Sequence, residues 1–143
     1  VNHSPDSPSL QYWMAEEWIG ARQSHFERGG QVNFAVVLRS TGALVGGISL
    51  GVNKTDEHGE LGYYIGKPHW NNGYATEATQ AVIKYGFEVL GLRRVFAAHF
   101  ARNPASGRVM QKAGMAYEGC LRQHVKKWDA FEDMIYYGII RED

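Results

Sequence analysis

A short segment of the chain joins turn-forming residues to the start of a helix, an arrangement that binds anions. Residues 69–78 read HWNNGYATEA, in which asparagine and glycine favour a turn and the following residues favour a helix. The first N–H groups of a helix lack intrahelical partners and lie at its positive end, so the junction predicts a phosphate site. Gly73 lets the backbone approach such a ligand closely, and Thr76 adds a hydroxyl donor. An ordinary strand-to-helix turn capped by Thr76 explains the same residues.

The flanking segments predict the elements that position this junction. Before it, residues 60–66 (ELGYYIG) are rich in aromatic residues and are typical of a strand. After it, apolar residues recur at three- and four-residue spacing, which predicts an amphipathic helix from Ala75 to about Gly91. The residues with this spacing are Ala78, Ala81, Val82, Tyr85, Val89 and Leu92.

The rest of the sequence predicts a single mixed α/β domain over residues 1–143. Strands are expected at 33–39, 44–52, 93–100, 115–125 and 132–140, and helices at 9–28 and 103–114. The first two of these strands flank Ser40-Thr41-Gly42 as a hairpin, and a polar loop (KKWDAF, 126–131) separates the last two. This alternation predicts a partly antiparallel sheet covered by helices.

Composition excludes several classes of protein. The chain has 143 residues, 44% of them hydrophobic, which suffices for one sizeable core. Fifteen basic and fifteen acidic side chains give a formal charge of zero, so no broad surface for nucleic acid or an anionic membrane is expected. A single cysteine, Cys120, cannot form an intramolecular disulfide, which favours a cytoplasmic location. No apolar run is long enough to predict a membrane span.

Several spaced motifs in this order resemble the GNAT superfamily of acetyl-CoA-dependent N-acetyltransferases. They are ELGYYIG, HWNNGYATEA, RRVFAAHF, NPASGRVMQKAGMAYEG and the closing EDMIYYGII. Within that superfamily, the chain looks most like the branch that contains the RimJ/RimL ribosomal-protein N-terminal acetyltransferases. The resemblance implies a mixed, mostly antiparallel central sheet flanked by helices, with a splayed strand pair at the acetyl-CoA site.

The resemblance also implies which residues bind acetyl-CoA. In the family, the loop that matches residues 70–75 wraps the pyrophosphate with backbone N–H groups, and the preceding strand pairs with the pantetheine arm. The implied cofactor-binding residues are Tyr63, Tyr64, Ile65, Trp70, Asn71, Asn72, Gly73, Tyr74, Ala75, Thr76, Asn103, Ser106, Arg108 and Lys112. Two of them depart from the usual pattern: Trp70 stands where Gln or Arg is usual, and Asn71 replaces a frequent glycine. For Arg108 and Lys112, solvated charges on a short helix are the alternative.

Two residues match catalytic positions of the family. Glu60 matches a position where some relatives carry the base that deprotonates the amine, and Ser106 matches the proposed proton donor to the thiolate. Glu60 could instead pair with a neighbouring cation at a strand end. Glu118 and His124 are further candidates for the base, although Glu118 lies in an EG pattern that recurs in the family for structural reasons. Direct attack of an amine on the thioester needs no metal, and the histidines show no ligand spacing.

The N-terminal part departs from the family pattern. Relatives have a strand before the part matched by residues 9–28, and that strand is expected to be absent here. Without that strand, one edge of the hairpin at 33–52 is expected to be open, so that another chain could cover it. The sequence therefore predicts either a homodimer or a chain that is missing its first strand. The acceptor is an amine, from a protein N-terminus or a small molecule, and Trp13, Trp18 and residues 126–131 are expected near its pocket. Two alternatives are a CoA-binding regulatory or sensor module and a structural domain without a cofactor.

Overall fold

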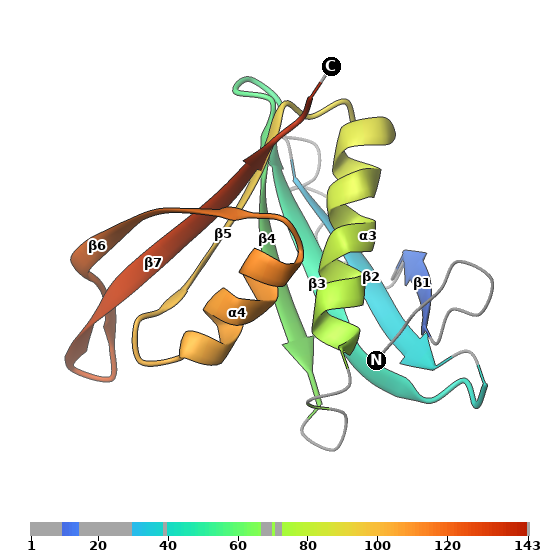
Figure 1. Ribbon diagram of the computed structural model, residues 1–143, viewed down its shortest axis with the longest axis horizontal. Helices are drawn as coiled ribbons and strands as arrows, with labels where there is room; N and C mark the ends of the chain where they lie inside the picture. The colour runs from blue at the N-terminus through green and yellow to red at the C-terminus, as the bar shows by residue number, and fades with distance from the viewer. Residues whose placement is uncertain (1–9, 15–29, 39, 67–69, 71–72, 143) are drawn as a thin grey trace.

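The computed structural model describes residues 10–14, 30–38, 40–66, 70 and 73–142 of the chain. Within these residues, seven strands form one sheet in the order β1-β2-β3-β4-β5-β7-β6. Two helices, α3 and α4, lie on the side of the sheet that faces the viewer in Figure 1. The strands are β1 (Leu10–Met14), β2 (Gln31–Leu38), β3 (Leu44–Asn53), β4 (His58–Ile65), β5 (Arg94–Phe100), β6 (Ala116–Lys127) and β7 (Ala130–Ile140). The helices are α3 (Tyr74–Glu88) and α4 (Pro104–Lys112).

The sheet is mixed and mostly antiparallel, as the sequence predicts. Every neighbouring pair runs antiparallel except β4 and β5, which are parallel. α3 makes the crossover between these two strands, since parallel neighbours cannot be joined by a tight turn. Gly66, after β4, and Gly73, before α3, therefore lie beyond the carboxyl end of the only parallel pairing among the described strands, where α/β folds commonly bind ligands.

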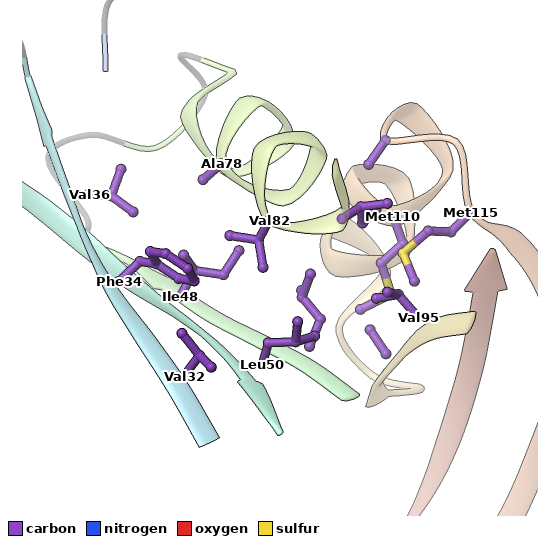
Figure 2. Packing of buried hydrophobic residues seen from close by; sticks show 14 of the residues in the cluster. Val32, Phe34, Val36, Ile48, Leu50, Ala78, Val82, Val95, Met110 and Met115 are labelled. Carbon is purple, nitrogen blue, oxygen red and sulfur yellow. The ribbon is translucent and has the colours of Figure 1, made fainter. Parts of the chain in front are cut away.

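α3 is held on the sheet by one apolar core. Figure 2 shows Ala78 and Val82 of α3 pointing toward the sheet, where Ile48 and Leu50 lie. Val82, Ile48 and Leu50 each contribute about 1.5–3 kcal/mol when their side chains are removed from water. Met110 and Met115 extend the core toward α4 and the start of β6. The core thus fixes both helices on the same face of the sheet.

Two predictions about the N-terminal half are wrong. Residues 10–14 do not form the expected helix but β1, which pairs antiparallel with β2 from Leu10 to Met14; the remainder of 9–28 lies outside the described residues. β1 covers the edge of β2 that was expected to be open, so the argument for a homodimer through that edge fails. An unpaired strand edge is a strong template for pairing, and here it overrides the local helix signals.

The last hairpin is tighter than the sequence predicts. β6 continues to Lys127 and β7 begins at Ala130, so most of the expected loop at 126–131 is strand. Trp128 and Asp129 make the turn with φ of 49° and 64°. Two left-handed residues are the geometry of a two-residue hairpin turn, but neither is the glycine or asparagine that would have signalled it.

Candidate active site

β4 and β5 separate in the middle of the sheet. They pair over residues 58–61 of β4 and 94–97 of β5, and the pairing stops there. β5 continues along β7 as far as Phe100, whereas β4 continues along β3 to Ile65. The predicted splayed strand pair is therefore confirmed. In Figure 1, α4 overlies the space where the two strands diverge.

The backbone of β4 presents polar groups to this gap. Gly66 donates its N–H to the Val45 carbonyl of β3 at 2.7 Å. Backbone groups alternate in direction along a strand, so those of Tyr64 also point toward β3, with which it pairs. Tyr63 and Ile65 point their backbone groups the other way, into the gap. A ligand that pairs with this edge would therefore bind Tyr63 and Ile65 rather than Tyr64.

Three side chains meet where α4 begins. Tyr63 of β4 shares a side-chain hydrogen bond with Ser106 of α4. The Asn103 amide Nδ2 donates to the Ser106 hydroxyl at 3.2 Å. Burial raises the pKa of the Tyr63 phenol, and the bond from Ser106 lowers it in part. Tyr63 precedes Asn103 and Ser106 by at least forty positions in the sequence, and the fold brings all three together at the Ser106 hydroxyl.

The N-terminus of α3 has the features of an anion site. Its N-cap is Gly73, with φ 77° and ψ 6°, a left-handed conformation that glycine adopts without strain. No side-chain hydrogen bond caps the helix within the described residues, and Tyr74, Ala75 and Thr76 form its first turn. Glu77 adds a carboxylate to the same turn, so the local field is not purely positive. The predicted residues Asn71 and Asn72 lie outside the described part of the chain.

Trp70 lies between the end of β4 and this helix. Its indole N–H donates to the Ile65 carbonyl at 2.7 Å. The backbone of Ile65 faces the gap, and Ile65 is a predicted cofactor-binding residue. Its carbonyl, however, already accepts a hydrogen bond from Trp70.

A cavity on the other face of the sheet contains Glu60. Side chains alternate along β4: Leu61 and Ile65 belong to the buried side under the helices, whereas Glu60 is exposed on the opposite side. The open cavity there has a volume of about 490 Å³. Its lining is Gly30, Gly51, Val52, Asn53, His58, Glu60 and Phe96.

His58 and Phe96 were not expected at the site. Their rings pack edge to face with centroids 5.2 Å apart. His58 could have been found from the sequence, because it precedes Glu60 by two positions in a strand and therefore shares its face. Phe96 carries no local signal, since only the register of β5 against β4 places it beside Glu60.

Glu60 and Ser106 lie on opposite faces of the sheet. Ser106 is on α4, on the helical side, and Glu60 opens to the cavity on the other side. The gap between β4 and β5 joins the two faces. A reacting group held in the gap could therefore have a base on one side and a proton donor on the other.

An ion pair spans three strands beside this cavity. Arg94 of β5 donates to both carboxylate oxygens of Glu118 of β6, at 2.7 and 2.6 Å. Gly138 of the intervening β7 leaves room for this ion pair, since a Cβ there would clash with the Glu118 carboxylate. The Arg94 guanidinium also lies over Phe96, 5.1 Å from the ring centroid. Glu118 is thus engaged in structure, which argues against its candidacy as the base.

Replacing Glu118 with glutamine should destabilise the protein only when the carboxylate would be charged. The hydrogen bond from Arg94, followed by its charge, lowers the pKa of Glu118 below its ordinary value. Its contribution is therefore present above the unfolded pKa of about 4.5 and is lost as the pH falls through the folded pKa. We expect a melting temperature a few degrees lower at pH 7, because a partly exposed pair is worth about 1 kcal/mol at most. The difference should shrink as the pH is lowered below about 4.5 and on through the folded pKa, and Asp129→Asn, at a fully exposed carboxylate, should show no such dependence.

The remaining predicted residues are more scattered. Arg108 and Lys112 are exposed and lie one turn apart on α4. The His124 ring contacts Tyr136 of β7, with centroids 6.3 Å apart. Residues 126–131 are far from Glu60: eight residues of β7 separate the row of Phe96 and Gly138 from the turn, about 27 Å along a strand. The expectation that these residues line the acceptor pocket is wrong for the cavity at Glu60. Trp13 has no described side chain, and Trp18 lies outside the described residues.

In the described part of the chain, no three His, Cys, Asp or Glu side chains gather so that they could hold a metal ion. Among the same residues, no helix is long and apolar enough to cross a membrane.

Comparisons with known proteins agree with this geometry. A family model described as an acetyltransferase (GNAT) domain matches residues 2–116. The chain is 36% identical over 110 residues to YnaD of Bacillus subtilis, named as an uncharacterized N-acetyltransferase, covering 77% of this chain and 65% of YnaD. It is 32% identical over 98 residues to a ribosomal-protein-serine acetyltransferase of Escherichia coli, covering 68% of this chain and 55% of that protein. The chain thus spans less than two thirds of the length of both relatives.

The same architecture occurs in a distant solved structure. It is that of spermidine N-acetyltransferase from Vibrio cholerae in complex with CoA and spermine, with a TM-score of 0.80. The two chains are 16% identical, and the match covers 92% of this chain and 95% of the other. At this identity the likeness concerns the fold alone.

Proposed function

Because the chain belongs to the acetyltransferase (GNAT) domain family, we propose that it moves an acetyl group from acetyl-CoA to a primary amine by direct attack on the thioester. The observation that carries the proposal is the gap between β4 and β5. The N-terminus of α3, which no side chain of the described residues caps, lies near one end of the gap, and the Ser106 hydroxyl lies at its side. A merely structural sheet has no need to leave four residues of a central strand unpaired on one side.

The residues present fit acetyl-CoA. The backbone around Gly73 would hold the pyrophosphate, because a left-handed glycine and first-turn N–H groups suit an anion. The gap-facing backbone of Tyr63 would pair with the amides of the pantetheine arm. The side chains of Arg108 and Lys112 are positively charged and could reach the phosphates of acetyl-CoA. Bound in this way, acetyl-CoA supplies the activated acetyl group.

The proposed chemistry divides proton transfer between two side chains. An amine is protonated at neutral pH, so Glu60 first accepts its proton, directly or through water. The nitrogen then bonds to the acetyl carbon as the carbon–sulfur bond breaks, and gap-facing N–H groups of β4 stabilise the charge on the carbonyl oxygen. Ser106 would give its hydroxyl proton to the departing thiolate and would recover, through water, the second proton that the nitrogen loses as the amide forms. Asn103 and Tyr63 hold the Ser106 hydroxyl in place meanwhile.

We favour a protein N-terminal α-amine as the acceptor, in a RimJ/RimL-like activity in the cytoplasm. The sequence similarity to a ribosomal-protein-serine acetyltransferase supports this choice. A small-molecule amine is the second candidate acceptor. The alternative function is a CoA-binding regulatory or sensor module without efficient turnover, which would keep the donor site but would not need Glu60 or Ser106.

Calorimetric titration with acetyl-CoA and desulfo-CoA tests the donor site first. We expect both compounds to bind. With acetyl-CoA, we also expect free CoA to be released when N-terminal peptides or polyamines are added. Folded protein that binds neither compound would rule out the enzyme and the sensor together. Turnover that is unchanged in Glu60→Gln and Ser106→Ala would refute the assigned roles.

Replacing Ser106 with alanine should slow the reaction without weakening donor binding. Loss of the proton donor should lower kcat about 100-fold, while the dissociation constant of desulfo-CoA should change less than about threefold, because the ligand has no thiolate to protonate. Ser40→Ala, in the exposed turn between β2 and β3, is the matched control and should alter neither value. Equal losses of kcat and affinity would mean that Ser106 acts through packing.

A further inference from the structure

The side chain of Trp70 is bonded to the backbone at the far end of the gap. Its indole N–H bonds to the Ile65 carbonyl at 2.7 Å, five residues back along the chain. On the other side of the strand, the Gly66 N–H bonds to the Val45 carbonyl at 2.7 Å. The end of β4 is thus fixed from both sides, once by β3 and once by a side chain from the following loop.

This bond connects the two parts of the donor site. The arm-binding part is the gap-facing backbone of Tyr63, two residues before the carbonyl that Trp70 engages. The phosphate-binding part begins at Gly73, three residues after Trp70. A ligand with an arm and a phosphate group can occupy both parts at once. Its affinity is highest when the protein already holds the two parts at the distance between the two groups, as for any two-site ligand.

We propose that Trp70 is a positioning residue that sets the distance between the arm-binding backbone and the phosphate-binding helix. The inference rests on the proposed function, since the two-part ligand is CoA. By engaging the Ile65 carbonyl, the indole also marks where strand-like pairing with the arm ends, so that the ligand turns there toward Gly73. Neither effect requires that Trp70 touch the ligand.

The chemistry of the side chain separates this role from packing. Trp70 is 55% exposed, so little core packing depends on its ring. Phenylalanine keeps an aromatic ring and removes the N–H donor, whereas glutamine removes the ring and keeps an N–H donor. If the hydrogen bond matters, glutamine should function better than phenylalanine at this position. If the ring matters, the order reverses.

The test uses the variants Trp70→Phe and Trp70→Gln. It compares the affinity for desulfo-CoA, which fills both parts of the site, with the affinities for ADP and pantetheine, which each fill one part. Affinities for desulfo-CoA, ADP and pantetheine are measured by calorimetry or by NMR shift titration. We expect Trp70→Phe to weaken desulfo-CoA at least tenfold and each part less than about twofold. Trp70→Gln should recover most of the loss. Trp128→Phe, at an 86% exposed ring in the β6–β7 turn, is the control and should bind all three as the wild type does.

The other outcomes are distinguishable. Unchanged binding of desulfo-CoA by both Trp70 variants, or an equal loss for desulfo-CoA and ADP, would overturn the positioning role, the latter by indicating direct contact with the phosphates. Better binding by Trp70→Phe than by Trp70→Gln would overturn the hydrogen bond as its basis. Failure of the folded wild type to bind desulfo-CoA would instead remove the proposed function itself.

Discussion

Gly73→Val should abolish binding of CoA while leaving the fold intact. A β-branched residue is severely disfavoured at φ 77°, and its side chain would occupy the space through which a phosphate approaches the first turn of α3. We expect at least a 100-fold rise in the dissociation constant of desulfo-CoA, about 2.8 kcal/mol. Calorimetry gives the affinity, and circular dichroism confirms the secondary structure.

The control for backbone strain is Gly42→Val. Gly42 has φ 74° in the turn between β2 and β3, and a Cβ there would meet nothing within 4 Å. Both variants therefore carry a similar conformational cost and should lose similar thermal stability. Only Gly73→Val should lose the ligand. Equal affinity in the two variants would mean that the phosphate site lies elsewhere.

Gly46→Ala should destabilise the protein strongly, although it adds only one methyl group. A Cβ at Gly46 would clash with the Tyr64 carbonyl oxygen and lie 3.0 Å from the Ile65 Cα. Both are backbone atoms, so the contact can be relieved only by moving β4 away from β3. We expect a loss of about 3 kcal/mol in the free energy of unfolding, the upper part of the range for overpacking, measured by urea denaturation.

Gly51→Ala in the same strand is the matched comparison. The nearest atom to its Cβ would be the Glu60 carbonyl oxygen at 3.8 Å, an ordinary contact. The variant should unfold within about 0.5 kcal/mol of the wild type, as substitutions without a specific contact do. If the two variants were equally stable, the close approach at the end of β4 would be refuted.

Local patterns sufficed where the signal lies within one element. The three- and four-residue spacing predicted α3, and the turn residues at 40–42 predicted the hairpin of β2 and β3. The burial is less regular than the pattern, since Val89 lies beyond the helix and is exposed. Segments 10–14 and 126–131 went wrong for one reason: pairing with a neighbouring strand overrode the local preference.

The site was only partly accessible to sequence reasoning. Gly73, Asn103 and Ser106 were chosen by motif, and the structure adds that Ser106 meets both Asn103 and Tyr63. The bond from Trp70 to Ile65 had no signal, because it depends on the path of the loop. The ion pair of Arg94 and Glu118 had no signal in the sequence either. It depends on the register of three strands and on the absence of a Cβ at Gly138.

The separation of Glu60 and Ser106 by the thickness of the sheet has a consequence for how the family can diversify. Donor and acceptor would enter from opposite sides and meet only in the gap, so neither needs to leave before the other arrives. Kinetics should then pass through a ternary complex, with no acetylated enzyme. With the proposed roles, substitutions on the side of Glu60 would change which amine is accepted without disturbing Gly73, Asn103 or Ser106. One donor apparatus can in this way serve many acceptors, and selection can act on the two faces independently.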